Sequence, residues 1–393
     1  MNRYFDFNAT TPMSDAARRA WLEATEMHWH NPSSLYRDAG IAKQKLEEAR
    51  ERLATLLGCD AGRIVFTSGA TESNNALFAS LATRLPQNAR IAISAIEHPS
   101  VREAAKEQGH SCPVQKTAQE CAASLVTIPV NADGVVEPDA VADIIARHTP
   151  ALISVMAANN ESGALQPWSS IAAVCQRADI PFHCDAAQWI GKMPSSSLGL
   201  CDYITGSAHK FGGPKGVGFL VLRDEDEQLH FLCGGPQENN RRAGTENYPA
   251  VEAMVTALEE LEPRLQVIAQ DQTAHRSSFI EAMHSHFPDL RLISEDAERL
   301  WNTTLMVMPR HDNLKWLTRL SRRGFSVSTG SACSSGKEGS SVVVQALGAS
   351  PDELKRVVRV SGGWDHTEAD WLALAEAFGE VDRELLQGGK PAN

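Results

Sequence analysis

The 393-residue chain predicts an α/β fold built on a large, mostly parallel sheet. Short apolar runs recur along its first part, and segments of helical length separate most of them. That alternation is typical of parallel strands joined by crossover helices. The runs cover residues 64–66, 91–93, 125–128, 152–156, 182–184, 203–205 and 217–222. We therefore expect a sheet of about seven strands with helices on both faces.

Helical spacing of apolar residues marks several of the connecting segments. Within residues 33–57 it is carried by Leu46, Ala49 and Leu53, and Gly58 is the expected stop. Segments 73–84 and 168–178 predict crossover helices. Residues 248–286 predict one long helical stretch that leaves the large domain.

The last third of the chain predicts a smaller α+β domain. Its expected strands are 303–308, 324–329 and 356–361. We place the large domain at 14–260 and the small domain at 1–13 together with 261–393. Because the sequence shows no internal repeat and no Pro- or Ser-rich linker, we expect the two domains to pack closely.

Composition and charge exclude several classes of protein. Hydrophobic residues make up 42% and charged residues 22% of the chain, as in ordinary globular enzymes. The net charge of -12 opposes binding to nucleic acid or anionic lipid, so small molecules or proteins are the expected partners. No apolar run is long enough to span a membrane, and the N-terminus lacks the apolar core of a signal peptide. The expected location is the cytoplasm.

The eight cysteines form no C-x-x-C pair, which favours neither a zinc site nor a disulfide framework, and we expect no metal. Seven of them are expected as small apolar residues in or near the core. Cys333 differs, because it lies in a run of small polar residues, 328–337, that contains two glycines. We expect its thiol to be exposed and mobile.

Lys210 and Asp185 provide the strongest chemical signal. Ala208-His209-Lys210 follows Phe182-His-Cys-Asp-Ala-Ala-Gln188 by about one strand-loop-strand unit. A lysine held beside a carboxylate suits pyridoxal phosphate, whose aldehyde bonds to an amine and whose ring nitrogen is kept protonated by an acid. Taken singly, Lys210 could be a surface lysine in a turn and Asp185 a strand-end cap. The flanking residues favour the cofactor interpretation.

A phosphate site is predicted where residues 64–73 pass from a strand through a glycine turn into a helix. The start of a helix offers free backbone N–H groups and a positive dipole, and the Thr71 hydroxyl adds a donor. Ser207 and His209 flank the lysine and could donate to the same phosphate. The alternative is an ordinary helix cap formed by Ser68, Thr71 and Glu72.

Two further polar segments follow predicted strands at the edge where open α/β sheets bind ligands. His98 comes just after strand 91–93; its ring could stack on a pyridine and move protons near neutral pH. Because it precedes a proline, His98 could also be a simple turn residue. Asn160 follows strand 152–156 and would bring an amide near a cofactor hydroxyl or a substrate carboxylate.

The chain resembles the cysteine desulfurases, which are pyridoxal phosphate enzymes of the class V aminotransferase superfamily with the type I aminotransferase fold. Ten motifs, in the family's order, carry the resemblance through most of the chain. They lie at 5–12, 31–34, 66–73, 97–98, 159–163, 183–188, 207–210, 212–218, 241–247 and 330–335. Ten such motifs in one order are very improbable by chance.

The resemblance implies a role for each matching residue at the cofactor. Lys210 would be the Schiff-base lysine and Asp185 would bind the pyridinium nitrogen. Gln188 and Asn160 would lie near the ring oxygen, and His98 would stack on the ring. The phosphate would be held by Ala70, Thr71, Ser207 and His209, with Thr245 reaching in from the other subunit of a homodimer.

The implied reaction converts L-cysteine to L-alanine. Cys333 matches the thiol that takes the sulfur as a persulfide for delivery to an acceptor protein, as in iron-sulfur cluster assembly, and Arg359 matches the arginine that binds the substrate carboxylate. The chain departs from the usual pattern at Tyr36, Pro236 and Trp364, which replace a histidine, a glycine and a second arginine.

Other functions remain open at this point. A selenocysteine lyase or another C–S lyase would use the same cofactor, and a sulfur carrier of low turnover would bind it without much reaction. A nucleotide-binding loop at 212–218 is disfavoured, because the segment lacks the Gly-Lys-Ser/Thr ending and runs into a strand.

Overall fold

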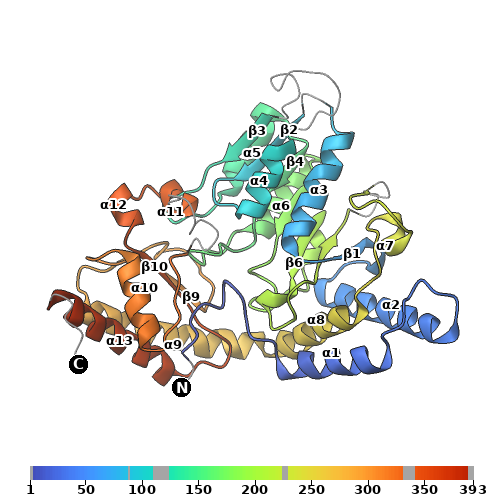
Figure 1. The fold of residues 1–393 in the computed structure, drawn as a ribbon. Helices are drawn as coiled ribbons and strands as arrows, with labels where there is room; N and C mark the ends of the chain where they lie inside the picture. Colours follow the sequence, from blue (N-terminus) through green and yellow to red (C-terminus); the bar gives the residue numbers. More distant parts are fainter. Residues whose placement is uncertain (1–2, 87–88, 109–123, 224–228, 331–340, 388–393) are drawn as a thin grey trace.

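The computed structural model describes residues 3–86, 89–108, 124–223, 229–330 and 341–387, and they form a large and a small sheet (Figure 1). The large sheet has seven strands in the order β1-β7-β6-β5-β4-β2-β3. They are β1 (Ile64–Thr67), β2 (Arg90–Ser94), β3 (Ser124–Ile128), β4 (Leu152–Ser154), β5 (Phe182–Asp185), β6 (Tyr203–Ser207) and β7 (Gly218–Val221).

Strands β6, β5, β4, β2 and β3 pair in parallel, whereas β7 runs antiparallel to both of its neighbours. Every strand expected in this sheet is present, and the predicted fold class is confirmed. The sheet is buried on both faces, which explains why its strands appear in the sequence as continuous apolar runs rather than as an alternation.

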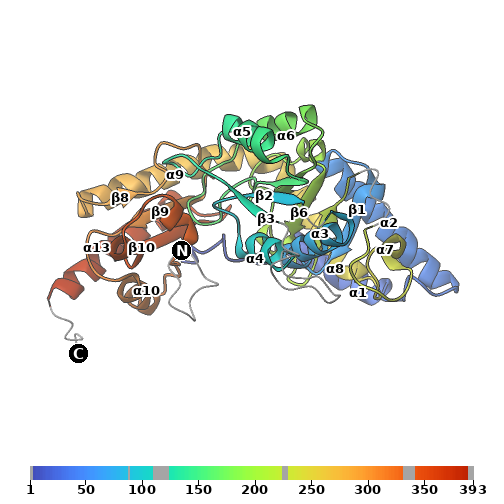
Figure 2. The same cartoon turned by 90° about the horizontal axis from the view of Figure 1, so that it is seen from above.

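Helices cover both faces of the large sheet. Leu77 and Phe78 of α3 (Ala70–Arg84) and Val101 of α4 (Pro99–Gln108) form one apolar cluster with the sheet. Figure 2 shows α5 and α6 on the opposite side. The second face is covered by α1 (Asp15–Met27), α2 (Arg37–Leu57), α5 (Pro138–His148), α6 (Trp168–Arg177) and α8 (Tyr248–Leu261).

The stop predicted for α2 lies at Gly58, as expected. Gly58 has a left-handed backbone with φ of 68°. A β-carbon there would lie 2.0 Å from the Ser196 carbonyl oxygen, so the close approach of two chain segments also requires glycine.

The long helical stretch expected at 248–286 is divided. A 3₁₀ turn, Glu262–Arg264, separates α8 from α9 (Leu265–His286). Pro263 lies inside this turn and has no N–H to donate to a continuous helix. The apolar spacing on either side predicts the helices but gives no sign of the break.

The small sheet has the order β10-β9-β8 and is antiparallel, with strands β8 (Arg291–Leu292), β9 (Thr303–Val307) and β10 (Val357–Ser361). The helices around it are α9, α10 (Asn313–Arg322), α11 (Val342–Ala346), α12 (Pro351–Leu354) and α13 (Glu368–Leu386). The prediction of a strand at 324–329 is wrong. This segment makes only isolated bridges, from Ser326 to Tyr4 and from Ser328 to Arg359.

The N-terminal segment runs beside the small sheet, where Asp6 bridges to Ser361 and Phe5 enters a cluster with Phe279, Trp316 and Trp371. Figure 1 shows both chain ends on this side of the molecule. The arrangement agrees with assigning 1–13 to the small domain, although the domain boundaries stay a prediction. In the part of the chain that the structure describes, no helix is long and apolar enough to cross a membrane.

The cysteines are less uniform than expected. Cys175, Cys184 and Cys201 are buried, Cys59 is half-buried and Cys233 is exposed. Cys112 and Cys121 lie outside the described residues. Cys233 was therefore wrongly expected near the core; it belongs to the loop between β7 and α7 (Gln237–Asn240).

A buried ion pair joins α2 to α7. Arg50 donates from Nη1 and Nη2 to the two carboxylate oxygens of Glu238 at 2.8 and 2.9 Å, and its guanidinium lies over the Phe66 ring. Glu238 also accepts the backbone N–H of Phe66 in β1 at 2.9 Å. The pair thus fixes the loop before residues 241–247 to the edge of the large sheet.

Replacing Glu238 with alanine should destabilise the protein strongly, because the change leaves the Arg50 charge buried without its main partner. We expect a loss of about 3–5 kcal/mol in the free energy of unfolding, measured by denaturant titration. Glu47→Ala is the matched control: Glu47 contacts the same arginine from a half-exposed position and should cost about 1 kcal/mol or less. Equal losses in the two variants would contradict the importance of the buried pair.

Candidate active site

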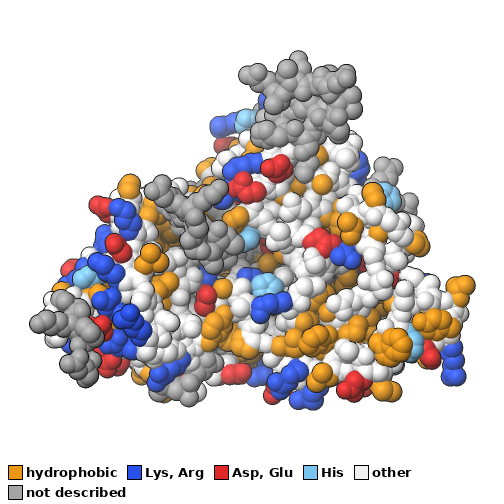
Figure 3. All heavy atoms as spheres, viewed as in Figure 1, with side chains coloured by type: hydrophobic (Ala, Val, Ile, Leu, Met, Phe, Trp, Pro, Cys, Tyr) orange, Lys and Arg blue, Asp and Glu red, His pale blue; other side chains and the backbone are white. Residues whose placement is uncertain are grey.

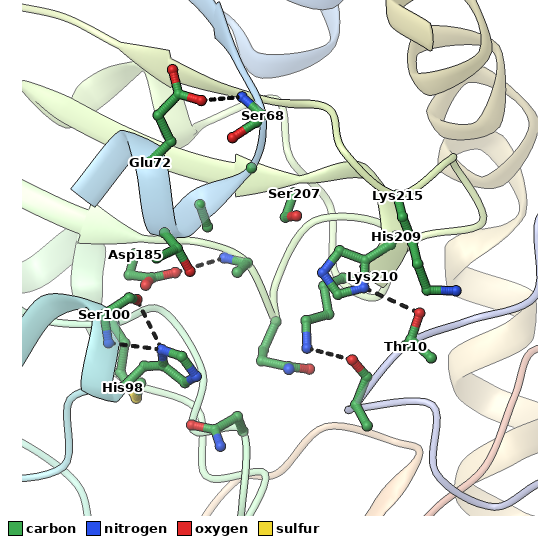
Figure 4. A pocket seen from close by; sticks show the side chains of 18 of the residues that line it. Thr10, Ser68, Glu72, His98, Ser100, Asp185, Ser207, His209, Lys210 and Lys215 are labelled. Carbon is green, nitrogen blue, oxygen red and sulfur yellow. Dashed lines mark hydrogen bonds between the residues drawn. The ribbon is translucent and has the colours of Figure 1, made fainter. Parts of the chain in front are cut away.

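A cavity of about 470 Å³ opens at the edge of the large sheet where β1, β4, β5 and β6 end. Nine of the predicted site residues line it: Ala70, Thr71, His98, Asn160, Asp185, Gln188, Ser207, His209 and Lys210. They come from distant parts of the chain and meet because parallel strands bring their carboxyl ends to one edge. Figure 4 shows His98 and Asp185 across the cavity from Lys210 and His209.

Lys210 ends a 3₁₀ turn, Ala208–Lys210, directly after β6. Its ammonium Nζ donates to the carbonyl oxygens of Asn8 at 2.7 Å and Ala9 at 2.9 Å. Thr11 holds the turn from the other side, since its N–H donates to the His209 carbonyl and its hydroxyl accepts from Gly212. The N-terminal segment therefore positions the lysine in the cavity.

Asp185 is the last residue of β5 and is buried. Its Oδ2 accepts from Asn74 Nδ2 at 3.0 Å, and its Oδ1 accepts from the Ala187 N–H at 3.0 Å. Both oxygens are oriented by donors from the protein. A carboxylate fixed in this way can accept one more hydrogen bond from a ligand in the cavity.

A second carboxyl group, Glu97, lies nearby but is used differently. It is buried, and its Oε1 accepts from the Ser94 hydroxyl at 2.5 Å and from the Met156 N–H at 2.8 Å. Burial raises the pKa of Glu97 to about 8, so the group is mainly neutral at pH 7. It joins the ends of β2 and β4 without adding a second negative charge beside Asp185.

The start of α3 is open to an anion. Its N-cap is Gly69, and no side chain caps the helix. The alternative of an ordinary side-chain cap is therefore wrong: Glu72 instead accepts the Ser68 N–H at 2.8 Å. A β-carbon at Gly69 would lie 3.3 Å from the Ser207 hydroxyl, so glycine keeps the space between them open. The free N–H groups of Ala70 and Thr71 provide donors at this end of the cavity.

His209 lies beside this end of the cavity with its Nδ1 3.1 Å from the Thr10 hydroxyl. Burial first, and then the positive charge of Lys210, lower its pKa to about 4. The ring is therefore neutral at pH 7. It can still donate a hydrogen bond to an anion from the nitrogen that carries the proton.

Sequence reasoning missed Lys192, whose side chain is 1% exposed. Its Nζ donates to Gln188 Oε1 at 2.9 Å, while Gln188 Nε2 donates to the Asn8 carbonyl at 2.9 Å. Burial lowers the pKa of Lys192 well below its ordinary value. These two contacts set the orientation of the Gln188 amide, with its oxygen toward Lys192 and its nitrogen toward Asn8. Nothing in the local sequence separates it from a surface lysine.

Asn8 was missed as well, although it joins the two sheets. Its amide Nδ2 donates to the Thr303 hydroxyl at 2.9 Å and to the Asn160 carbonyl at 3.2 Å, and its Oδ1 accepts from Asn302 at 3.1 Å. Its carbonyl accepts from Lys210 and Gln188. The matching motif at 5–12 was the available signal.

Arg359 lies on β10 just outside the cavity lining. Its Nη2 pairs with Asp6 Oδ1 at 2.6 Å, and its Nη1 donates to the carbonyls of Asn160 at 2.8 Å and Gly330 at 3.1 Å. Its Nε is buried without a partner among the described residues. The guanidinium is thus adjacent to Asn160, and its role toward a substrate stays a prediction.

The two remaining predicted residues are not in the cavity. Thr245 is exposed and does not line it in this single chain. Cys333 lies outside the described residues. Trp364 donates from its indole to the Gly191 carbonyl at 2.9 Å and packs edge-on against Phe7.

Residues 3–374 match the model of the class-V aminotransferases. The chain belongs to this family. It is 33% identical to a protein named cysteine desulfurase IscS from Dictyoglomus turgidum, over 93% of this chain and 91% of that protein. It is 32% identical to the protein of the same name from Methanosarcina thermophila, over 97% and 92%.

Solved structures give the same result. A NifS-like protein superposes with a TM-score of 0.87 at 28% identity, covering 98% of this chain and 100% of the other. A structure titled SspA in complex with cysteine gives 0.78 at 30% identity, covering 92% and 98%. The predicted resemblance to the cysteine desulfurases is confirmed.

Proposed function

We propose that this class-V aminotransferase is a pyridoxal phosphate-dependent cysteine desulfurase. One arrangement carries the proposal: Lys210, Asp185 and the uncapped start of α3 face the same cavity. The full-length relatives named cysteine desulfurase support the activity.

The cavity fits the cofactor in charge and in hydrogen bonding. The phosphate would bind at the α3 terminus, where Ala70 and Thr71 offer N–H groups and Ser207 a hydroxyl. The ring nitrogen would face Asp185, and the ring oxygen would face Asn160 and Gln188. When bound, the group supplies an aldehyde that reacts with amines and a ring that withdraws electrons from the substrate.

The protein's part is to bind and orient the substrate and to move protons. The Lys210 amine would take the α-proton of L-cysteine at Nζ and would later give protons back from Nζ to the carbon chain. The Asn8 and Ala9 carbonyls hold this nitrogen in place. Arg359 would bind the substrate carboxylate from beside Asn160.

The sulfur goes to Cys333. Its thiolate attacks the substrate sulfur, an S–S bond forms as the C–S bond breaks, and the electron pair of the broken bond stays with the carbon skeleton. That skeleton gains protons and leaves as L-alanine. The product on the enzyme is a persulfide, ready for transfer to an acceptor protein.

A homodimer is part of the proposal, because the exposed side chains of one face are unusually apolar. Trp21, Leu22, Met27, Trp29, Leu35 and Tyr36 belong to α1 and the segment before α2 and are exposed. Figure 3 shows hydrophobic side chains gathered on this lower side of the molecule. Such a surface suits a second copy of the chain, and Thr245 is exposed as its proposed role in the partner's phosphate site requires.

Two variants should separate cofactor chemistry from sulfur transfer when L-alanine, sulfide and bound persulfide are measured with L-cysteine and a thiol. Lys210→Ala should lose all turnover, because it removes the amine that takes the α-proton. Cys333→Ala should keep the cofactor, shown by its visible absorbance, but form no persulfide by mass spectrometry. Normal turnover in Lys210→Ala, or the extra sulfur on Cys184 or Cys233, would overturn these assignments.

Arg359→Ala should weaken the use of L-cysteine by roughly thirtyfold to several thousandfold in kcat/KM, the effect of about 2 to 5 kcal/mol for an unpaired carboxylate. Arg356→Ala is the control, since Arg356 binds the Met308 and Pro309 carbonyls away from the cavity. Trp364→Arg should change activity modestly. A tenfold gain in turnover in Trp364→Arg together with little loss in Arg359→Ala would show that the carboxylate site has been assigned to the wrong residue.

Dimerisation and cofactor retention should be linked. We expect Trp29→Asp to shift sedimentation toward the monomer and to release pyridoxal phosphate on dialysis, because the phosphate site loses the partner's Thr245. Leu386→Asp introduces the same charge at an exposed apolar residue of α13 and should change neither property. A monomer that keeps its cofactor as tightly as the dimer would refute the shared site.

A further inference from the structure

His98 lies at the amino end of α4, whose first residue is Pro99. Its ring nitrogen Nδ1 accepts the backbone N–H of Ser100 at 3.1 Å and lies 2.8 Å from the Ser100 hydroxyl oxygen. A backbone N–H can only donate. The Nδ1 atom must therefore carry a lone pair, and the proton of the neutral ring must be on Nε2.

The direction of the second bond follows from Asn74. Its amide Nδ2 donates one hydrogen to Asp185 at 3.0 Å and the other to the Ser100 hydroxyl oxygen at 2.9 Å. The opposite orientation of the amide would place its oxygen against the Asp185 carboxylate. Its oxygen Oδ1 is buried without a partner among the described residues, so the two donated bonds decide the orientation. Because the Ser100 oxygen accepts from Asn74, its own hydrogen is free to point to His98 Nδ1.

We infer that Ser100 is a positioning residue which, through its backbone N–H and its hydroxyl, holds His98 as the neutral tautomer protonated on Nε2. The inference deepens the proposed function and rests on it for the identity of the ligand. His98 lines the cavity, so the ring offers a hydrogen-bond donor there rather than a base. Proton transfer at the substrate is then left to Lys210.

The surrounding charges agree with a neutral ring. Burial is the largest influence and lowers the pKa of His98, and the positive charges of Lys210 after β6 and Arg102 on α4 lower it further. Asp185 at the end of β5 acts in the opposite direction. Protonating Nδ1 would also convert an acceptor of two hydrogen bonds into a donor facing the Ser100 N–H. Charging the ring would therefore break the contacts that orient it.

The test is NMR spectroscopy of the full chain labelled with ¹⁵N at histidine, with and without added pyridoxal phosphate, and His98→Gln assigns the His98 signals. In the natural protein at about pH 7 we expect one unprotonated and one protonated ring nitrogen, with a second proton taken up only below the usual pH range of a histidine. A protonated Nδ1 or a charged ring at about pH 7 would overturn the inference without any variant.

Variants then assign the effect to Ser100. Ser100→Ala removes the hydroxyl donor, so His98 should begin to take up a proton at higher pH, whereas Ser100→Thr keeps a hydroxyl and should behave as the natural protein. Ser285→Ala removes an exposed helical hydroxyl of α9 that bonds only to the Glu281 carbonyl, and it should have no effect. Titration of Ser100→Ala identical to that of the natural protein would show that Ser100 does not position the ring.

The NMR result does not depend on turnover, so the two hypotheses fail separately. Absence of L-alanine from a protein with the expected His98 signals would reject the desulfurase assignment and leave the tautomer established. Formation of L-alanine by a protein whose His98 ring is charged would reject the tautomer and leave the desulfurase assignment standing.

Discussion

The geometry of the cavity depends on one asparagine in the N-terminal segment. Asn8 is 1% exposed, and its polar groups are bonded to residues of both sheets. Its backbone N–H donates to the Ser361 hydroxyl on β10, and its carbonyl accepts from Lys210 after β6. An unsatisfied buried amide costs about 1–3 kcal/mol, so these bonds resist any sliding of one sheet against the other. The lysine and the small sheet are thus held as one unit.

The rest of the site follows from the edge of a parallel sheet. The strands bring Asp185, Ser207 and Asn160 to one edge, and α3 and α4 begin there with their N–H groups facing the cavity or its lining. The two helix starts are used differently. The start of α3 stays uncapped and is available to an anion, whereas that of α4 binds the His98 ring. Two helix starts at the same edge of the sheet therefore differ: one has no side-chain cap, and the other orients a histidine ring.

Much of this could be predicted from the sequence, because buried strands and helix starts leave local patterns. Apolar runs located all seven strands of the large sheet, and Gly58 marked the end of α2. The small domain was less predictable: segment 324–329 forms no strand, because Ser326 and Ser328 make single bridges to two different partners, Tyr4 of the N-terminal segment and Arg359 of β10. Lys192 could not be found, since its role depends on a buried contact with Gln188 that no spacing reveals. The roles of Arg359, Thr245 and Cys333 rest on the resemblance and remain predictions.

The ion pair between Arg359 and Asp6 changes how selection of an amino acid would operate. The guanidinium already holds a carboxylate, with only Asp6 partly exposed to the solvent. A substrate carboxylate that binds there as proposed would take the place of Asp6 on the guanidinium, so Asp6 would compete with the substrate for Arg359. A thiol-containing amine without a carboxylate has nothing to exchange and leaves the internal pair intact. Under the proposed role of Arg359, the resting protein would therefore carry its own competitor for the acid group of the substrate.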